Sequence, residues 1–451
     1  MNKSISSIIN GKEYRGGGIR QIVYPYSTDA LSFFEYADKI EISRFQIIDD
    51  KKAWKNELRI AANKLRQILS EERTLKRMLR IVANETGSPI QFHKEDIRVV
   101  QEFLTKLTQL DRLLPKGFFS EPKGNVLLVL CANEPITVTT ILVFTALWTG
   151  NVVYVKPSSK TPTFAYFLVK TLAKYPAFRK RLHLVLSDRQ ETERLIATQS
   201  FDFVLSFGSR ATSKALRKLC VEAETEFLEE SEGNDWCYVD RDNSSLSRIA
   251  TTLQESFTRH NGQMCNAVRG VLVHKDVYDE FIRHLQKEVS SVHMGDPLLI
   301  NSRAGALLAG TAMHVANIVQ DAQNKGGRIE NYSFTENVIS PTLIFDPNDD
   351  CAIISEGIFG PVLWVKPVGS VYEAIDFYNR KNLHGLGFTV FSQNKKVVDI
   401  LSSAIRAGRI NINNHPLHIG LFDPLGGVKL SGKGGPHYWV EKLTNRKFVT
   451  R

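Results

Sequence analysis

The chain has 451 residues, of which 43% are hydrophobic and 24% are charged. This balance is that of an ordinary soluble globular protein with two or three domains. The formal net charge is +10, but the basic residues of 51–80 alternate with apolar and acidic ones at helical spacing. We therefore interpret them as a solvated helix face and expect no nucleic-acid partner. The longest apolar stretch, 126–147, is interrupted by polar residues, so no membrane span is expected.

Helical and β patterns follow one another in a definite order. Apolar residues around an Asn-Gly pair predict a hairpin over 8–14, and apolar residues at intervals of three and four predict two helices over 49–84 and another over 94–114. After residue 124, helical segments alternate with apolar runs that read as strands at 126–130, 151–155, 183–186, 203–206, 238–239, 270–273, 341–345, 360–365 and 388–391. Alternation of this kind predicts doubly wound parallel sheets in two α/β lobes, with ligands bound beyond the carboxyl ends of the strands.

The cysteines bear on both compartment and chemistry. They stand at positions 131, 220, 237, 265 and 351 without a Cys-x-x-Cys pair. The pattern argues against a disulfide framework and a zinc site, and for a reducing compartment, here taken as the cytoplasm. Cys265 lies among small and polar residues, and the tight backbone expected at Asn261-Gly262 would expose its side chain to a substrate. An isolated cysteine is more often a packed core residue, so the motifs around it decide its interpretation.

Six short segments occur in a fixed order. They are Ala132-Asn133-Glu134-Pro135, Lys156-Pro157-Ser158-Ser159, Phe207-Gly208-Ser209, Gly262-Gln263-Met264-Cys265-Asn266-Ala267, Ile358-Phe359-Gly360-Pro361 and Pro424-Leu425-Gly426-Gly427. Each is weak alone, but together they resemble the aldehyde dehydrogenase superfamily over nearly the whole chain. The resemblance implies an α/β fold of two doubly wound domains plus a small β oligomerisation arm. It places the NAD(P)-binding domain at 1–105 and 122–230, the catalytic domain at 231–433, and the arm at 106–121 and 434–451.

The resemblance implies a covalent role for Cys265. Its thiolate would attack an aldehyde carbonyl to give a thiohemiacetal, from which a hydride passes to the nicotinamide. The Asn133 amide, with the Cys265 backbone N–H, would hold the developing oxyanion, a contribution of about 3 kcal/mol for one donor. The alternative for Asn133 is a capping residue at a helix start.

A base that activates water against the thioester is expected within Leu228-Glu229-Glu230-Ser231-Glu232-Gly233. Aligning Gly233 with the last glycine of the family's Glu-Leu-Gly-Gly segment makes Glu230 the equivalent residue. Because Glu232 replaces a glycine, Glu229 and Glu232 remain alternatives, and a solvated acidic turn is the other interpretation. Neighbouring carboxylates would raise the pKa of Glu230, which suits a base that works near neutrality.

The same resemblance implies the cofactor site. Its residues are Ala132, Lys156, Ser159, Gly208, Ser209 and Phe359. Lys156 would reach the adenosine ribose, and the N–H groups of Gly208 and Ser209 would meet the pyrophosphate at a helix start. No metal is needed.

Two positions depart from the family pattern. Many NAD-using relatives carry a Glu where this chain has Ser159. A carboxylate would repel a 2′-phosphate, whereas Ser can donate to it, so NADP is favoured over NAD. Gly357 stands where relatives have a Glu for the nicotinamide ribose, so that end of the cofactor is expected to be held loosely.

These features predict NAD(P)-dependent oxidation of a small-molecule aldehyde to a carboxylic acid, in a homodimer or homotetramer. One alternative is an NADPH-dependent acyl-thioester (acyl-CoA) reductase that uses the same Cys265. The other is a catalytically impaired family member that acts as a binding protein, suggested by Gly357 and the altered Glu-Gly segment. Glu134, where relatives often have an aromatic residue, hints at a polar or cationic substrate.

Overall fold

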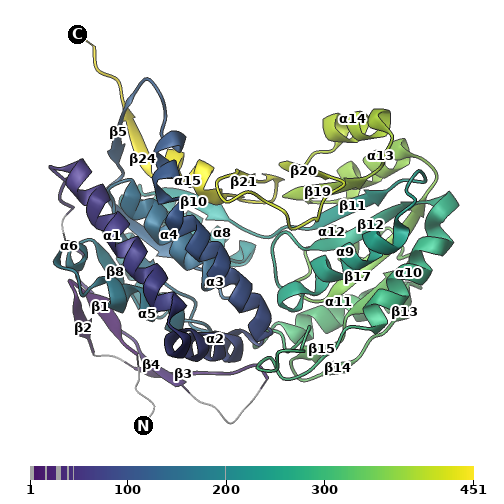
Figure 1. The fold of residues 1–451 in the computed structure, drawn as a ribbon, viewed down its shortest axis with the longest axis horizontal. Coiled ribbons are helices and arrows are strands. Elements are labelled where there is room, and N and C mark those ends of the chain that lie inside the picture. The colour runs from purple at the N-terminus through teal and green to yellow at the C-terminus, as the bar shows by residue number, and fades with distance from the viewer. Residues whose placement is uncertain are drawn as a thin grey trace.

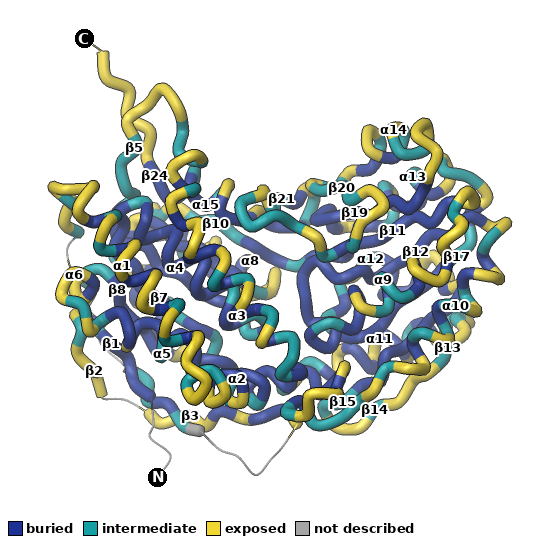
Figure 2. The backbone as a smooth tube through the Cα atoms, viewed as in Figure 1, coloured by how far each residue is buried: buried dark blue, intermediate teal, exposed yellow. Residues whose placement is uncertain are grey.

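The computed structural model describes residues 5–15, 18–26, 32–37, 40–43, 45–198 and 200–450. Two α/β lobes lie side by side, each built on its own sheet (Figure 1). Buried residues concentrate in the two sheets and the inner faces of their helices (Figure 2). None of the described helices combines the length and apolar character that crossing a membrane requires.

The first sheet has seven strands. Its order is β10 (Glu226–Glu230), β9 (Phe203–Phe207), β6 (Asn125–Val129), β7 (Val152–Lys156), β8 (Leu182–Leu184), β1 (Ser7–Ile9) and β2 (Lys12–Tyr14). The five strands from β10 to β8 run parallel, and the hairpin β1–β2 adds antiparallel at one edge. The predicted hairpin is confirmed: Asn10 (φ 50°) and Gly11 (φ 74°) form a two-residue turn with both residues left-handed.

Helices cover both faces of this sheet. One face carries α1 (Lys51–Ser70), α3 (Ile90–Thr105), α4 (Thr137–Trp148) and α5 (Thr163–Leu172), and the other carries α7 (Arg189–Ala197) and α8 (Arg210–Glu222). Neighbouring residues of β6 belong to two different hydrophobic cores. Leu128 packs in the core on the face that carries α4, and Leu127 packs in the core on the face that carries α8. This is why the predicted strand had to be apolar throughout. The short α6 (Pro176–Arg179) precedes β8.

The second sheet also has seven strands. Its order is β13 (Arg328–Glu330), β16 (Thr342–Phe345), β17 (Val362–Val368), β12 (Val268–His274), β11 (Asp235–Val239), β19 (Gly387–Phe391) and β20 (Arg409–Ile412), all parallel except β13. One face packs against α9 (Leu246–Thr258) and α10 (Tyr278–Ser290). The other packs against α11 (Ala312–Asn324), α12 (Ala352–Ser355), α13 (Val371–Lys381) and α14 (Lys395–Ala404). The predicted doubly wound α/β architecture is therefore confirmed.

The helical region before β6 differs in detail from the prediction. The two helices expected over 49–84 are α1 and α2 (Glu72–Thr86), and α2 ends at Gly87, whose φ of 69° forms a left-handed cap. The helix expected over 94–114 begins earlier, at Ile90, and α-helical geometry ends at Thr105; a 3₁₀ helix (Leu107–Leu113) follows. Sequence periodicity does not distinguish these two helix types over a few residues.

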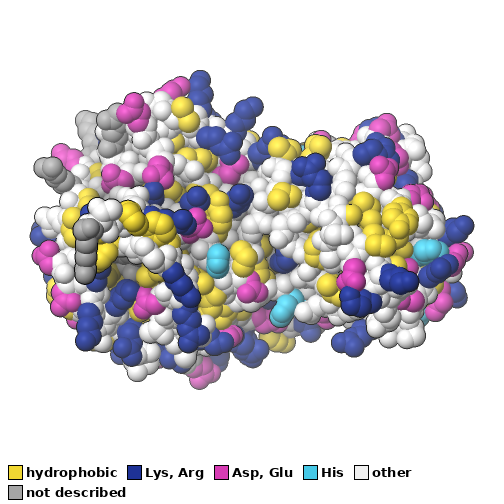
Figure 3. Space-filling model, turned by 90° about the horizontal axis from the view of Figure 1, so that it is seen from above, with side chains coloured by type: hydrophobic (Ala, Val, Ile, Leu, Met, Phe, Trp, Pro, Cys, Tyr) yellow, Lys and Arg dark blue, Asp and Glu magenta, His cyan; other side chains and the backbone are white. Residues whose placement is uncertain are grey.

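A two-stranded arm projects from the first lobe (Figure 1). It pairs β5 (Phe119–Pro122) antiparallel with β24 (Thr444–Lys447). Between 433 and 444 the chain forms α15 (Gly435–Lys442), which contacts α4 rather than extending the arm. On the face seen in Figure 3, basic and acidic side chains are interspersed, as expected of a solvated surface.

Candidate active site

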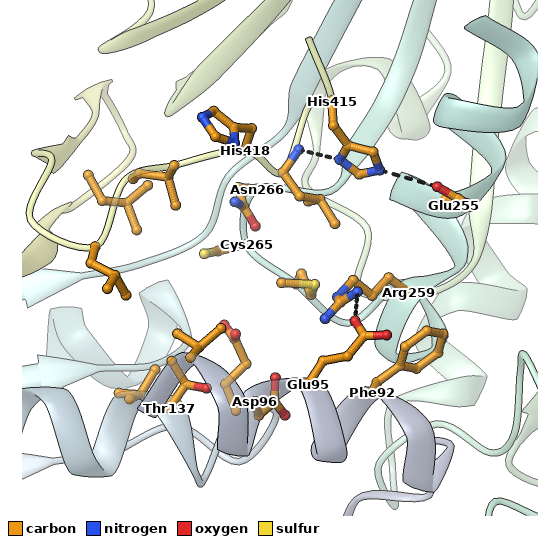
Figure 4. Close-up of a pocket in the computed structure, with 18 of the residues that line it drawn as sticks. Phe92, Glu95, Asp96, Thr137, Glu255, Arg259, Cys265, Asn266, His415 and His418 are labelled. Atoms are coloured by element: carbon orange, nitrogen blue, oxygen red, sulfur yellow. Dashed lines mark hydrogen bonds and ion pairs between the residues drawn. The ribbon is translucent and has the colours of Figure 1, made fainter. Parts of the chain in front are cut away.

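A cavity of about 1120 Å³ lies where the two lobes meet. Its walls come from α3, α4, α9, α15 and the loop between β20 and α15. Figure 4 shows Cys265 between Asp96 and Thr137 on one side and the loop that carries His415 and His418 on the other. The cavity therefore brings the candidate nucleophile into reach of a small molecule.

A sharp turn presents the Cys265 segment. His260, Asn261 and Gly262 have consecutive left-handed φ angles of 49°, 58° and 70°. A Cβ at Gly262 would lie 2.3 Å from the Gly360 carbonyl oxygen, so only glycine fits there. The Asn261 amide donates to the Ala306 carbonyl at 2.6 Å and accepts from Gly305 N–H at 2.7 Å, which holds the turn in place.

Arg269 is a structural residue of this site that the sequence analysis did not single out. It is fully buried, and its guanidinium donates to the carbonyls of Gly360 (2.9 Å) and Met264 (3.0 Å). It thus ties the Cys265 segment to the segment after Phe359. The available signal was a charged residue inside the apolar run 267–273, since a buried charge needs fixed partners.

Asn133 reaches the same segment from the first lobe. Its Nδ2 donates to the Gln263 carbonyl at 2.8 Å, two residues before Cys265. The helix-cap alternative is wrong, because α4 begins at Thr137 with Ile136 as its N-cap and no side-chain cap. The amide has a second N–H beyond the one that this bond uses.

The Cys265 thiol is only 8% exposed and borders the cavity. Burial first, and then the charges of Glu230 and Glu134, raises the pKa of the thiol well above its ordinary value. The thiol of the free protein is therefore protonated at neutral pH. Formation of the thiolate requires a nearby base or an added positive charge.

Of the three candidate glutamates, only Glu230 is enclosed beside Cys265. It ends β10, is fully buried, and neither carboxylate oxygen has a hydrogen-bond partner among the described residues. Burial and then the charge of Glu134 raise its pKa well above the ordinary value. Its carboxylate packs on Gly434, where a Cβ would lie 2.1 Å from Oε2. The solvated-turn interpretation is therefore wrong for Glu230.

Glu229 and Glu232 have other partners. Glu229 forms an ion pair with Arg217 of α8. Glu232 accepts from the Arg210 backbone N–H at 3.1 Å and so occupies the start of α8. Of the three glutamates, Glu230 is the one that is fully buried, and its charge acts on the Cys265 thiol.

The cofactor candidates lie beyond the carboxyl ends of β7 and β9. Lys156 ends β7, and burial followed by the charge of Arg20 lowers its pKa to about 8. Burial, and then the charge of Arg20, also lowers the pKa of Lys160, whose Nζ donates to the Ala309 carbonyl at 2.6 Å. Arg20 and Lys160 thus form with Lys156 a cation cluster beside Ser159, and the distance of Arg20 in sequence explains why the motifs did not reveal it.

Two polar groups at the start of α8 already have hydrogen-bond partners within the chain. The Gly208 N–H donates to the Glu230 carbonyl at 3.1 Å, and the Ser209 hydroxyl caps α8 by accepting from Thr212 N–H at 3.3 Å. A Cβ built on Gly208 would meet nothing within 4 Å, so the space above it is open. The predicted contact of Gly208 and Ser209 with a pyrophosphate stays a prediction.

The remaining candidates flank this region. Ala132 is half-buried directly before Asn133, and Phe359 is half-buried directly before Gly360. Nothing in their surroundings tests a cofactor contact, so their roles stay predictions.

Close backbone packing explains why a glycine stands at position 357. A Cβ there would lie 2.8 Å from the Gly233 carbonyl oxygen, and a Cβ on Gly233 would lie 2.2 Å from the Cys265 carbonyl oxygen. The three backbones are stacked. The side chain of a glutamate at 357 would displace the backbone at 233, which packs on the backbone of Cys265. Glycine avoids this displacement.

The protein has two α/β lobes with a cavity where they meet. A cysteine on a sharp turn borders that cavity. The profile of the aldehyde dehydrogenase family matches residues 52–449. The chain therefore belongs to the aldehyde dehydrogenase family. The predicted family and the predicted fold are confirmed.

Individual relatives are distant. A 4-trimethylaminobutyraldehyde dehydrogenase from Oryzias latipes is 28% identical over 340 residues, which cover 71% of this chain and 66% of that protein. A dimeric NADP-preferring aldehyde dehydrogenase from Rattus norvegicus is 27% identical over 334 residues, 74% of this chain and 72% of that protein. The solved structure of lactaldehyde dehydrogenase from Escherichia coli has a TM-score of 0.87 at 21% identity and covers 99% of this chain and 98% of that one.

Proposed function

We propose that this protein oxidises an aldehyde to a carboxylic acid with NADP or NAD as hydride acceptor, through a thioester on Cys265. The observation that carries the proposal is the convergence at the thiol. Asn133 is hydrogen-bonded to Gln263, two residues before Cys265, and the buried Glu230 lies near enough for its charge to raise the pKa of the thiol. The relatives named aldehyde dehydrogenases support the same reaction class.

In the first half-reaction, the Cys265 thiol loses its proton and its sulfur bonds to the carbonyl carbon. The free N–H of Asn133 and the Cys265 backbone N–H stabilise the oxyanion of the thiohemiacetal. When bound, the nicotinamide cofactor supplies the acceptor for the hydride that leaves this carbon. The product is a thioester on Cys265.

In the second half-reaction, Glu230 removes a proton from water, which attacks the thioester carbon and releases the acid and the thiol. The raised pKa of Glu230 makes its carboxylate a stronger base than a solvent-exposed one.

For the cofactor we propose a preference for NADP. The cluster of Arg20, Lys156 and Lys160 offers positive charge beside Ser159, where a 2′-phosphate would carry negative charge. The residues that would hold the adenosine end therefore suit NADP. Ala132, Gly208, Ser209 and Phe359 would line the rest of the cofactor site.

The test is a panel of aldehydes with NADP or NAD, followed at the absorbance of the reduced cofactor. We expect turnover by the wild type and none by Cys265→Ala. Cofactor binding without turnover of any aldehyde would refute the proposal and favour the binding-protein alternative.

A second candidate is NADPH-dependent reduction of an acyl thioester such as acyl-CoA. The retained Glu230 argues against it, because a thioester reductase needs no activated water. Turnover of acyl-CoA with NADPH, without turnover of aldehydes, would establish this direction.

We also propose that the arm mediates homodimer formation, with a homotetramer as the alternative. Its tip exposes apolar side chains: Phe118, Phe119, Phe448 and Val449 are 45–72% exposed. Exposed apolar groups of this kind are typical of interfaces. The cytoplasmic location stays a prediction from the unpaired cysteines.

A further inference from the structure

Three buried side chains converge beneath the wall of the cavity. His93 and Asp96 lie one turn apart on α3, and His260 lies in the turn that presents Cys265. Their exposed fractions are 0%, 5% and 1%. None of them has a part in the proposed oxidation, so their convergence calls for its own explanation.

The two imidazoles lie close to different oxygens of the Asp96 carboxylate. His93 Nδ1 lies 3.1 Å from Asp96 Oδ2, and His260 Nε2 lies 3.4 Å from Asp96 Oδ1. One candidate ligand atom from each residue can be chosen so that all three lie within 4.8 Å of one another. Ligand atoms at about 2.0–2.1 Å around a tetrahedral Zn²⁺ are roughly 3.3 Å apart, so binding would draw the three side chains slightly closer together.

Hydrogen bonds on the far side fix the ring of His93. The Thr86 hydroxyl donates to the Val82 carbonyl at 2.7 Å, so its single proton is used. It must therefore accept from His93 Nε2–H at 2.9 Å. A neutral His93 then points the lone pair of Nδ1 at the Asp96 carboxylate, a repulsive arrangement that an added proton, or a cation bound by both groups, would relieve.

His260 is held in the same way. Its Nδ1 lies 2.9 Å from the Ser88 hydroxyl, while its buried Nε2 has no hydrogen-bond partner within the described ranges. In metal sites, a ligating histidine is oriented by a hydrogen bond from its other ring nitrogen. Here Thr86 and Ser88 supply that bond from the connection between α2 and α3.

We propose that His93, Asp96 and His260 bind a divalent first-row transition ion of the Zn²⁺ type. Two imidazole nitrogens and one carboxylate are the ligand set such ions prefer, and they leave a fourth position for water. Asp96 borders the cavity, so an ion reaches the cluster from there (Figure 4). The ligand set contains no cysteine, which is why the cysteine pattern did not indicate it.

The bound ion would brace the site. It would connect α3 of the first lobe to the turn at 259–262, which sets the position of Cys265. The role of the ion is therefore to position the Cys265 segment. It lies beneath the residues that line the cavity and takes no part in the bonds that form and break at the thiol.

The experiment uses the full chain after removal of metal with EDTA. Titration with Zn²⁺ in a calorimeter should show one equivalent bound per chain, with an increase in Tm. With Co²⁺ in place of Zn²⁺, visible d–d bands should appear without a thiolate charge-transfer band. Absence of saturable binding of both ions would overturn the proposal. A thiolate band would also overturn it, because the ion would then be bound at a cysteine.

Variants separate this cluster from adventitious sites. Asp96→Asn should lose the equivalent, whereas His314→Gln, at an exposed histidine of α11, should keep it. Ser88→Ala keeps all three ligands and should weaken binding roughly tenfold with unchanged stoichiometry, as expected for loss of a hydrogen bond to a ligand. If Asp96→Asn does not fold, Ser88→Ala and the wild type decide. Wild-type affinity in both Asp96→Asn and Ser88→Ala would refute the assignment.

Discussion

Replacement of Glu230 by Gln tests the proposed division of the reaction into two halves. Gln has nearly the shape of Glu, so contact with Gly434, where the space is smallest, is retained. The change removes only the ability to accept a proton from water. Formation of the thioester should therefore continue, and its hydrolysis should slow.

The expected magnitude follows from the setting of the carboxylate. General base catalysis contributes about 10²–10⁴-fold, or roughly 3–5 kcal/mol of transition-state stabilisation. Burial and the charge of Glu134 raise the pKa of Glu230 well above its ordinary value, so the ionised fraction increases as the pH rises. The wild-type steady-state rate should rise with pH over the range in which Glu230 ionises, and the rate of Glu230→Gln should lose that component.

Rapid mixing with an aldehyde and NADP provides the assay. The wild type should turn over without a resolved burst if hydrolysis is fast, whereas Glu230→Gln should release about one equivalent of reduced cofactor per site and then proceed slowly. Glu229→Gln and Glu232→Gln are matched controls, because both carboxylates are engaged with α8. Equal loss of the burst and the steady-state rate in Glu230→Gln, or loss of the steady-state rate in a control instead, would refute the reasoning.

Three further predictions follow from the same contacts. Asn133→Ala should lower kcat about 10²–10³-fold by removing an oxyanion donor, and a loss below tenfold in a steady-state assay would contradict that role. Ser159→Glu should shift the ratio of kcat/KM values from NADP toward NAD, and Arg20→Ala should raise KM for NADP more than for NAD; an unchanged ratio in both would disprove the 2′-phosphate site. Burial raises the pKa of Glu85 to about 8, above the ordinary value, so the folded state retains this proton longer than the unfolded chain. The stability it contributes is complete below about pH 4.5 and is lost as pH rises toward 8; Glu85→Gln should flatten this part of the Tm profile, and identical profiles would refute the assignment.

The fold could be predicted because its patterns are local. A strand buried on both faces is expected to be apolar, as the run 126–129 is, and a two-residue left-handed turn favours Asn-Gly, as at Asn10-Gly11. The strand Glu226–Glu230 lacks such a pattern, because three glutamates interrupt it at the edge of the sheet. Its existence depends on pairing with β9, which the residues themselves do not indicate.

The site could be predicted in part, for a related reason. Cys265, Asn133 and Glu230 were identified through short motifs; the structure bonds Asn133 to the Cys265 segment and buries Glu230 within reach of its charge on the thiol. Arg269 and Arg20 were missed because their partners are distant in sequence. A buried guanidinium that holds two backbone carbonyls is defined by the tertiary fold, and no spacing rule identifies it.

Two of the departures from the family pattern, Gly357 and Glu232, belong to one packing arrangement. Gly357 lies against the carbonyl of Gly233, and Gly233 lies against the carbonyl of Cys265. Because no side chain fits between these backbones, the glutamate that relatives carry at 357 would displace the segment that presents the thiol. Glu232, directly before Gly233, turns outward to the start of α8, so the added carboxylate is kept away from the thiol. The altered residues therefore maintain the position of Cys265, and their presence is compatible with a working nucleophile.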